Sequence, residues 1–268
     1  MEKIKVEKNS KLSKFSLENF KGLSFSAFRK ALRNKDIKVN GKRVKEDVLL
    51  SVGDVVEIFY SPVDRQPFTI CYQDNDLLVI DKNSGFDYDE VLEKLTSQIG
   101  KVYGVHRLDR NTSGLMLFAL NKMAEKELLL GFKEHKFIKI YQAEVKGFFD
   151  KKQDVLSAYL VKDSENSVVK IFKEKVEGSV AIKTGYSVIE EKEFTSIIEV
   201  RLYTGKTHQI RAHFAYISHP LVGDGKYGDY DFNKMLKAKN LALRSKSITL
   251  NFTEKSYLKR LNNKTFTV

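Results

Sequence analysis

The sequence predicts an α+β protein whose central sheet is mixed, largely antiparallel and flanked by helices. Short apolar or alternating segments follow one another through hairpin-type turns, as between 68–72 and 77–80. The helical patterns are few and do not alternate regularly with strands, as they would in a parallel sheet. Two prolines five residues apart, Pro62 and Pro67, mark a connector that separates a small first unit from the rest.

The composition restricts the class of protein. The chain has 268 residues, and 47 Lys and Arg against 35 Asp and Glu give a net charge of +12, so a polyanion is the expected partner. A hydrophobic content of 42% suffices for a packed core. The single Cys71 excludes a disulfide framework within the chain and any cysteine-rich metal site. No apolar run approaches the roughly 18 residues of a membrane span. We expect a cytoplasmic protein that does not bind membranes.

We expect a small α+β domain over residues 1–60, a linker over 61–67 and a large domain over 68–268. In the first domain the pattern predicts a short helix with Phe28, Ala31 and Leu32 on one face, a hairpin turning at Asn40-Gly41, and a last strand at 55–60. Basic side chains border the helix and line the hairpin. They suit either a cradle for backbone phosphates or a solvated charged face: Arg29, Arg33, Lys38, Lys42 and Arg43.

The large domain alternates strands with a few helices. The hairpin of 68–72 and 77–80 comes first, and a helix is expected over 91–99. The continuous apolar run 115–120 predicts a buried strand, after which Asn121 caps a helix to about residue 134. Alternating strands follow at 138–146 and 197–203, and residues 206–218 are compatible with a helix that stops before Pro220.

The segment 106–114, His-Arg-Leu-Asp-Arg-Asn-Thr-Ser-Gly, sets a carboxylate between two guanidinium groups directly before the buried strand. Arg107 and Arg110 flank Asp109, and nearby positive charge favours the ionised form of a carboxyl group. An ionised, partly buried Asp109 can act as a nucleophile or a base. The same residues also suit a structural Asp–Arg pair at a turn, and the segment alone leaves both interpretations open.

The segment 204–213, Thr-Gly-Lys-Thr-His-Gln-Ile-Arg-Ala-His, combines a glycine turn with a helix start rich in basic and amide side chains. Free N–H groups at a helix N-terminus, together with such side chains, form an anion site. His208 and His213 are five residues apart and therefore do not share a helical face as metal ligands four residues apart would. Since no carboxylate lies within the segment, we expect no metal site.

The alternating strand 138–146 places Lys139 and Tyr141 on one face, opposite Ile138 and Ile140. A tyrosine in this position serves either as packing in a half-buried sheet or as a platform on which a nucleobase stacks. The strand alone does not decide between the two.

In this order, these segments resemble the RluA-type family of pseudouridine synthases. The similarity covers residues 68–252 and rests on Val79-Ile-Asp-Lys-Asn-Ser-Gly85, the segment 106–115, Lys139-x-Tyr141, the segment 204–211, and Gly223-Asp-Gly-Lys-Tyr-Gly228. The first domain resembles the RNA-binding module named after ribosomal protein S-four, through Lys38-Val-Asn-Gly-Lys-Arg-Val44 and Leu50-Ser-Val-Gly-Asp-Val-Val56.

The resemblance implies an RNA pseudouridine synthase that flips specific uridines out of structured RNA and isomerises them without metal or cofactor. It implies that Asp109 is the catalytic carboxylate, that Tyr141 lies over the flipped base and that Arg211 pairs with Asp109. Asp109 either attacks the anomeric carbon or removes a sugar proton; both remain open. Arg107 would fill the space that the base leaves. The remaining RNA-binding positions of this domain would be Arg110, Lys139, Lys206, His208 and Gln209.

Other hypotheses fit some of these features. The first domain favours large-subunit ribosomal RNA over transfer RNA as the substrate, by family analogy. An RNA-binding or ribosome-assembly factor without activity would share the charge, but it has no need of Asp109, Tyr141 and Arg211 together. A base-excising hydrolase would need a second carboxylate, for which Asp81 and Asp224 are candidates near the motifs. We expect a monomer.

Overall fold

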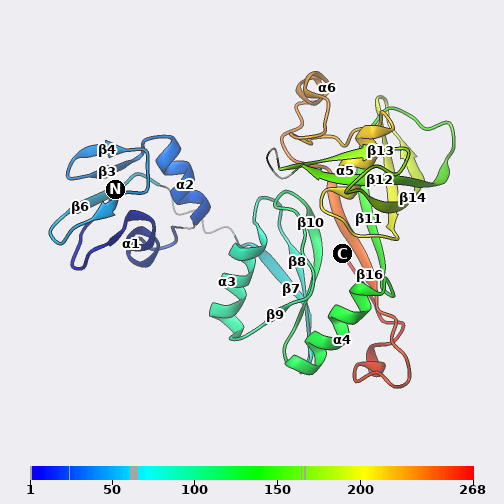
Figure 1. The fold of residues 1–268 in the computed structure, drawn as a ribbon, viewed down its shortest axis with the longest axis horizontal. Coiled ribbons are helices and arrows are strands. Elements are labelled where there is room, and N and C mark those ends of the chain that lie inside the picture. Colours follow the sequence, from blue (N-terminus) through cyan, green and yellow to red (C-terminus); the bar gives the residue numbers. More distant parts are fainter. Residues whose placement is uncertain (1, 24, 61–65, 164, 166) are drawn as a thin grey trace. The chain divides into compact units, whose positions relative to one another are not determined.

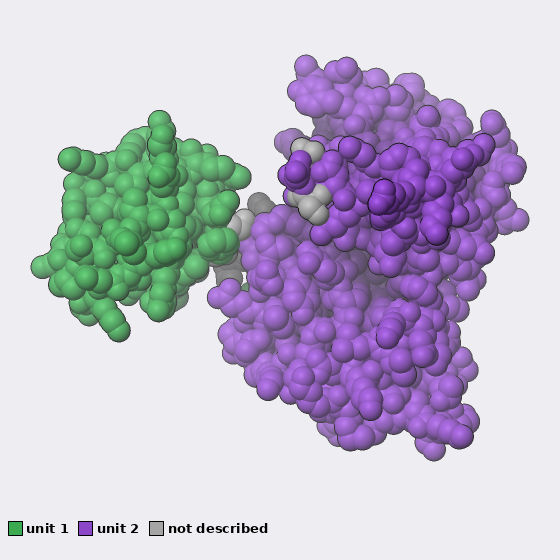
Figure 2. Space-filling view, in the orientation of Figure 1, with its two compact units in different colours: residues 1–66 green, residues 67–268 purple. Residues whose placement is uncertain are grey.

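The computed structural model describes residues 2–23, 25–60, 66–163, 165 and 167–268, and forms two compact units, 1–66 and 67–268 (Figure 2). Residues 61–65 of the expected linker lie outside the described part. Each unit has its own hydrophobic core. None of the described helices combines the length and the apolar character that crossing a membrane requires.

The first unit packs two helices and a small antiparallel sheet around one core (Figure 1). The strands of this sheet are ordered β1-β6-β3-β4, and β2 pairs with β5. The predicted hairpin is present: Asn40 and Gly41 both have positive φ, as a two-residue turn requires. The elements are β1 (Glu2–Lys5), β2 (Ser10–Lys11), α1 (Leu12–Asn19), α2 (Phe25–Arg33), β3 (Ile37–Val39), β4 (Lys42–Val44), β5 (Leu49–Leu50) and β6 (Val55–Ile58).

In the second unit, eleven strands of the described residues form one sheet, ordered β13-β12-β14-β15-β11-β16-β10-β8-β7, with β17 on β16 and β9 on β10. Along this order β10 and β16 run parallel and the other neighbours antiparallel. The predicted fold class is therefore confirmed. The strands are β7 (Phe68–Gln73), β8 (Leu77–Lys82), β9 (Tyr103–Gly104), β10 (Ser113–Ala119), β11 (Ile138–Lys146), β12 (Gln153–Asp163), β13 (Val168–Phe172), β14 (Val180–Glu191), β15 (Thr195–Leu202), β16 (Leu243–Thr249) and β17 (Thr265–Thr267).

Helices cover both faces of the sheet around β8 and β10. Leu78 and Ile80 belong to the core that contains the buried side of α3, whereas Leu77 and Val79 belong to the core of α4. This explains why β8 and β10 are continuously apolar instead of alternating. Asn121 caps α4 as predicted, by accepting the N–H of Ala124. The helices are α3 (Tyr88–Ile99), α4 (Lys122–Lys133), α5 (Gln209–Tyr216), α6 (Tyr230–Met235) and the 3₁₀ turn η1 (Lys259–Leu261).

The helix that was predicted over 206–218 is shorter, because α5 begins only at Gln209. His208 adopts a left-handed conformation with φ of 54° and therefore cannot belong to the first helical turn. Lys206 and Thr207 instead lie in the loop that joins β15 to α5.

Gly114 lets the strand after the Asp109 segment approach β16. Its φ is 106°, and a Cβ at this position would lie 2.2 Å from the carbonyl oxygen of Ser245. Glycine is therefore required twice here, for the backbone conformation and for the close parallel pairing of β10 with β16.

We predict that Gly114→Ala lowers the free energy of unfolding by about 2 kcal/mol or more, because the added methyl group pushes β10 away from β16. Chemical denaturation measures this change. Gly178→Ala is the matched control, since Gly178 also has a positive φ but has no atom within 4 Å of its would-be Cβ. An equal loss in both variants would show that backbone strain alone, and not the strand contact, is responsible.

Candidate active site

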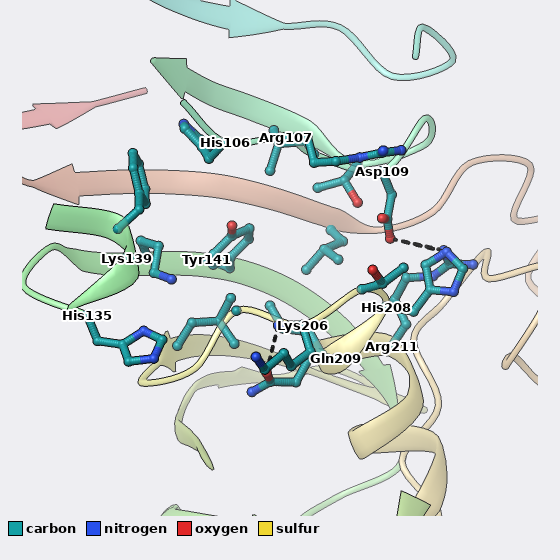
Figure 3. A pocket seen from close by; sticks show the side chains of 18 residues that line it. His106, Arg107, Asp109, His135, Lys139, Tyr141, Lys206, His208, Gln209 and Arg211 are labelled. Carbon is teal, nitrogen blue, oxygen red and sulfur yellow. Dashed lines mark hydrogen bonds and ion pairs between the residues drawn. The ribbon is translucent and has the colours of Figure 1, made fainter. Parts of the chain in front are cut away.

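A cavity of about 360 Å³ lies in the second unit, and four segments distant in sequence line it (Figure 3). Asp109 comes from the segment before β10, Tyr141 from β11, Arg211 from α5 and Leu243 from β16. Strands β10, β16 and β11 are neighbours in the sheet, so the cavity lies over its middle. The order of the strands thus brings the separate motifs of the sequence to one place.

Buried polar contacts hold the Asp109 segment in position. Lys82 is fully buried, and its ammonium donates to the carbonyl oxygens of Asn83, Phe86 and Arg110 at 2.8–3.0 Å. His106 Nε2 accepts the N–H of Leu117 at 2.9 Å. Burial lowers the pKa of Lys82 to about 8 and that of His106 to about 3. Both residues therefore support the backbone on either side of Asp109.

The predicted contact between Asp109 and Arg211 is present. Nη1 of Arg211 donates to Oδ2 of Asp109 at 3.2 Å. The rest of the guanidinium binds Asp224: Nε donates to Oδ2 at 2.7 Å and Nη2 to Oδ1 at 2.8 Å. Asp224 is 2% exposed. This two-bond pairing fixes the guanidinium plane, so that the remaining edge faces Asp109.

Arg211 and Asp224 keep each other charged. Burial opposes the charge on Arg211, but Asp224 and, to a lesser degree, Asp109 raise its pKa above the ordinary value. Burial by itself would raise the pKa of Asp224, whereas Arg211 and the N–H groups of Lys226 and Tyr227 hold it below the usual range. Asp109, at 24% side-chain exposure, is the carboxylate of the pair that faces the cavity.

His208 adds a second contact to Asp109. Its Nε2 lies 3.8 Å from Oδ2 of Asp109, and its Nδ1 lies 2.9 Å from the hydroxyl of Tyr227. That hydroxyl oxygen accepts the N–H of Val169, which leaves its proton for Nδ1 of His208. Burial lowers the pKa of His208 despite Asp109. A neutral His208 then directs its Nε2–H toward the Asp109 carboxylate.

Tyr141 forms part of the cavity wall and lies between Lys139 and Asp109 (Figure 3). Its side chain is largely buried, and burial raises its pKa to about 12. The phenol therefore keeps its proton near neutral pH. An aromatic ring that borders a cavity beside a carboxylate can stack on a planar base.

Some predicted residues lie elsewhere or have other partners. Arg107, Lys139, Lys206 and His208 line the cavity, whereas Arg110 pairs with Asp87 and Glu90 on α3 and its N-cap. Gln209 also borders the cavity, but its side-chain amide has partners within the protein. Its amide oxygen accepts from Thr204 and Lys206, and its amide nitrogen donates to Lys183 and Thr184, so no hydrogen-bonding capacity is left for RNA.

The roles of Asp224 and Tyr227 were not predicted. Asp224 was considered only as a second carboxylate for a hydrolase, and its pairing with Arg211 leaves no signal in the residues next to it. His213 is buried, and its Nδ1 forms a hydrogen bond with Thr184 Oγ1.

Across the described ranges, no group of three or more His, Cys, Asp or Glu side chains has the arrangement of a metal site.

Comparison with known proteins assigns this site to a family. The family described as RNA pseudouridylate synthase matches residues 76–216, which include Asp109, Tyr141 and Arg211. Ribosomal large subunit pseudouridine synthase C of Vibrio cholerae is 31% identical over 83% of this chain and 78% of its own length. The chain belongs to the RNA pseudouridylate synthase family. The Escherichia coli protein of the same name is 31% identical over 86% of this chain and 80% of its own length.

Solved structures of the family have the same fold. Human RNA pseudouridylate synthase domain containing 1 superimposes with a TM-score of 0.63 at 25% identity, covering 75% of this chain and 82% of that one. Human RNA pseudouridylate synthase domain containing 4 gives a TM-score of 0.57 at 23% identity, covering 68% and 83%. The large mixed sheet is thus the pseudouridine synthase fold that the resemblance implied.

We predict that Asp224→Asn lowers the free energy of unfolding by about 3 kcal/mol at neutral pH, because Arg211 loses its buried counter-ion. The pKa of Asp224 is lower in the folded state than in the unfolded chain. The stability that its charged form contributes is therefore present at neutral pH and is lost as the pH falls through the folded-state pKa. Denaturation at neutral and acidic pH should therefore show a difference from wild type that shrinks in acid.

Asp229→Asn is the matched control for this substitution. Asp229 lies in the same loop and pairs with Lys146 at the surface, so its replacement should leave the unfolding midpoint close to wild type. Equal midpoints for Asp224→Asn and wild type at neutral pH would refute the stabilising role of the Asp224–Arg211 pair.

Proposed function

We propose that this chain isomerises specific uridines of large-subunit ribosomal RNA to pseudouridine, with Asp109 as the catalytic carboxylate. The proposal rests on the arrangement of the side chains around the cavity. Asp109 faces the cavity, Arg211 donates a hydrogen bond to its carboxylate, and the ring of Tyr141 borders the same cavity. A cavity of about 360 Å³ is within the range in which proteins bind small organic groups, which suits a nucleoside.

The reaction that such a site performs is an exchange of one bond. The bond from the anomeric carbon to N1 of uracil breaks, the base turns, and a bond from the same carbon to C5 forms. The hydrogen at C5 is replaced by one at N1, so no atom is gained or lost. Asp109 either attacks the anomeric carbon as a nucleophile or removes a neighbouring sugar proton as a base. In both cases the carboxylate must reach the sugar, and Asp109 borders the cavity.

The other cavity residues suit a uridine taken out of its helix. Tyr141 offers a flat surface to the flipped base, and its protonated phenol is a donor rather than a base at the start of the reaction. Arg107 is exposed at the cavity and available to fill the gap in the RNA stack. Flipping costs a few kcal/mol, which contacts of this kind offset.

The structure does not favour the hydrolase hypothesis. Asp224 is bound to Arg211, and Asp81 pairs with Arg244 at 2.6 Å. Neither carboxylate borders the cavity. Asp109 is thus the carboxylate that the described cavity offers to a substrate, which suits an isomerase more than a mechanism with two acids.

Two further observations support ribosomal RNA as the substrate and the first unit as an RNA-binding module. The relatives from Vibrio cholerae and Escherichia coli are named for the large ribosomal subunit. In the first unit, Arg29 and Arg33 lie four residues apart on α2, and Lys38 pairs across the hairpin with Arg43. With Lys42 these side chains project from a helix and a hairpin, and we propose that residues 1–60 are the S-four-type module that binds RNA backbone.

We predict that Asp109→Asn retains RNA binding and loses pseudouridine formation by at least about a hundredfold, because an amide can neither attack nor accept a proton as a carboxylate does. Conversion in ribosomal RNA transcripts, without added metal or nucleotide, measures the rate, and filter binding measures the affinity. Mapping pseudouridine in cellular RNA with and without the gene identifies the uridine. A wild-type rate for Asp109→Asn would exclude the proposed role of Asp109.

We predict that replacing Arg29, Arg33, Lys38, Lys42 and Arg43 by Gln weakens RNA affinity and flattens its salt dependence, because fewer phosphates are neutralised. The single-turnover rate at saturating RNA should stay near wild type, since these residues lie outside the catalytic unit. Replacing Lys5, Lys8 and Lys14 by Gln removes charge from the same unit as a control. Equal affinity for wild type and the five-residue variant would contradict the binding role of the module.

A further inference from the structure

A second group of charged side chains lies in the same cavity, apart from the Asp109–Arg211 pair. Figure 3 shows Lys139 and His135 on the side of Tyr141 away from Asp109. Lys206 comes from the loop before α5 and lies close enough to His135 to affect its titration, as does Lys139. Strand β11, the end of α4 and the β15–α5 loop therefore contribute one basic group each.

Lys139 is the most informative of the three. It is 9% exposed, yet its ammonium makes no hydrogen bond or ion pair with another described residue. Burial lowers its pKa, and no carboxylate counteracts this effect. A buried charge without a partner destabilises a protein, so a residue of this kind is typical of a binding site.

The surroundings of Lys139 leave room for a ligand. Gly205 faces the ammonium, and a Cβ on Gly205 would lie 3.0 Å from Nζ of Lys139. His135 follows Glu134, the C-cap residue of α4, has a positive φ of 55° and also borders the cavity. Partial burial, Lys139 and Lys206 together lower the pKa of His135. The positive charges of Lys139 and Lys206 thus favour the neutral form of His135, and a bound anion would reverse this effect.

We propose that His135, Lys139 and Lys206 form a phosphate subsite that binds a backbone phosphodiester next to the target uridine. This inference rests on the proposed function and specifies how the substrate is held. Lys139 and Tyr141 are two residues apart on one face of β11, a separation of about 7 Å. A base stacked on Tyr141 and its own flanking phosphate at Lys139 therefore belong to one nucleotide.

The chemistry favours a phosphodiester over a carbonyl group of the base. A base carbonyl accepts from one or two donors but brings no negative charge to Lys139 and Lys206. A phosphodiester brings a full negative charge on two oxygens and accepts from several donors at once. Every nucleotide of RNA carries this group, so the subsite fixes the position of the strand without reading its sequence.

The direct test combines Lys139→Met with RNA that lacks one charge. The probe is a short RNA hairpin containing the modified uridine, with a single neutral methylphosphonate at either flanking linkage or at a distant one. Binding is measured in the Asp109→Asn background, so that the result does not depend on turnover. We expect one flanking methylphosphonate to weaken binding by about tenfold with Lys139 present, and to have no further effect with Lys139→Met.

Further variants keep the test independent of folding. Lys139→Met removes an unpaired buried charge, so its melting temperature should equal or exceed that of wild type. Lys206→Met, at the exposed rim, should show the same loss of sensitivity to the flanking methylphosphonate. Lys255→Met, an exposed lysine outside the cavity, should keep the full sensitivity.

The outcomes separate this inference from the proposed function. If each flanking methylphosphonate weakens RNA binding as much in Lys139→Met as it does with Lys139 present, the phosphate subsite is overturned, even if wild type forms pseudouridine. This result would indicate that Lys139 contacts the base or supports the cavity wall. Failure of wild type to form pseudouridine would overturn the proposed function, whereas the binding measurements would still report on the phosphate contact.

Discussion

The shared guanidinium of Arg211 is the contact on which the site depends. It joins a buried carboxylate that fixes its orientation, Asp224, to one that faces the cavity, Asp109. Without Asp224 the guanidinium could rotate, and without Arg211 the negative charge of Asp109 would lose its nearest positive partner. Removing one partner of a buried ion pair destabilises the protein, whereas the intact pair is no more stable than apolar residues of the same size would be; what the pair adds here is the direction of a functional group. Asp224 therefore orients Asp109 indirectly, through Arg211.

The sheet makes this contact possible between residues that are 102 positions apart. The parallel pair β10 and β16 connects the Asp109 segment, through β11, to β15, the strand that leads into α5, and Gly114 allows the close pairing of β10 with β16. Lys82 and His106 then hold the backbone on both sides of Asp109. Fold and site are coupled through these few buried polar groups, which explains why the motifs contain more residues than the chemistry itself uses.

Local patterns predicted much of this structure. The hairpin at Asn40-Gly41, the buried strand before Asn121 and the strand 138–146 each follow from periodicity or from a turn signal within a few residues. The long strands β12 and β14 were not identified, because their exposed positions carry both apolar and polar side chains and blur the alternation. The late start of α5 was missed because φ of His208 depends on its contacts with Asp109 and Tyr227, which are distant in sequence. The same holds for Asp224, whose partner cannot be read from its neighbours.

The most direct test of the account is the single-turnover rate of pseudouridine formation by Arg211→Lys, measured with the RNA affinity. Lysine keeps the positive charge but cannot bind Asp224 with two hydrogen bonds while contacting Asp109. We expect a rate at least about tenfold below wild type with RNA affinity unchanged, because the Asp109 carboxylate is no longer held in position. A wild-type rate, or a loss confined to RNA affinity, would contradict the central role of the shared guanidinium.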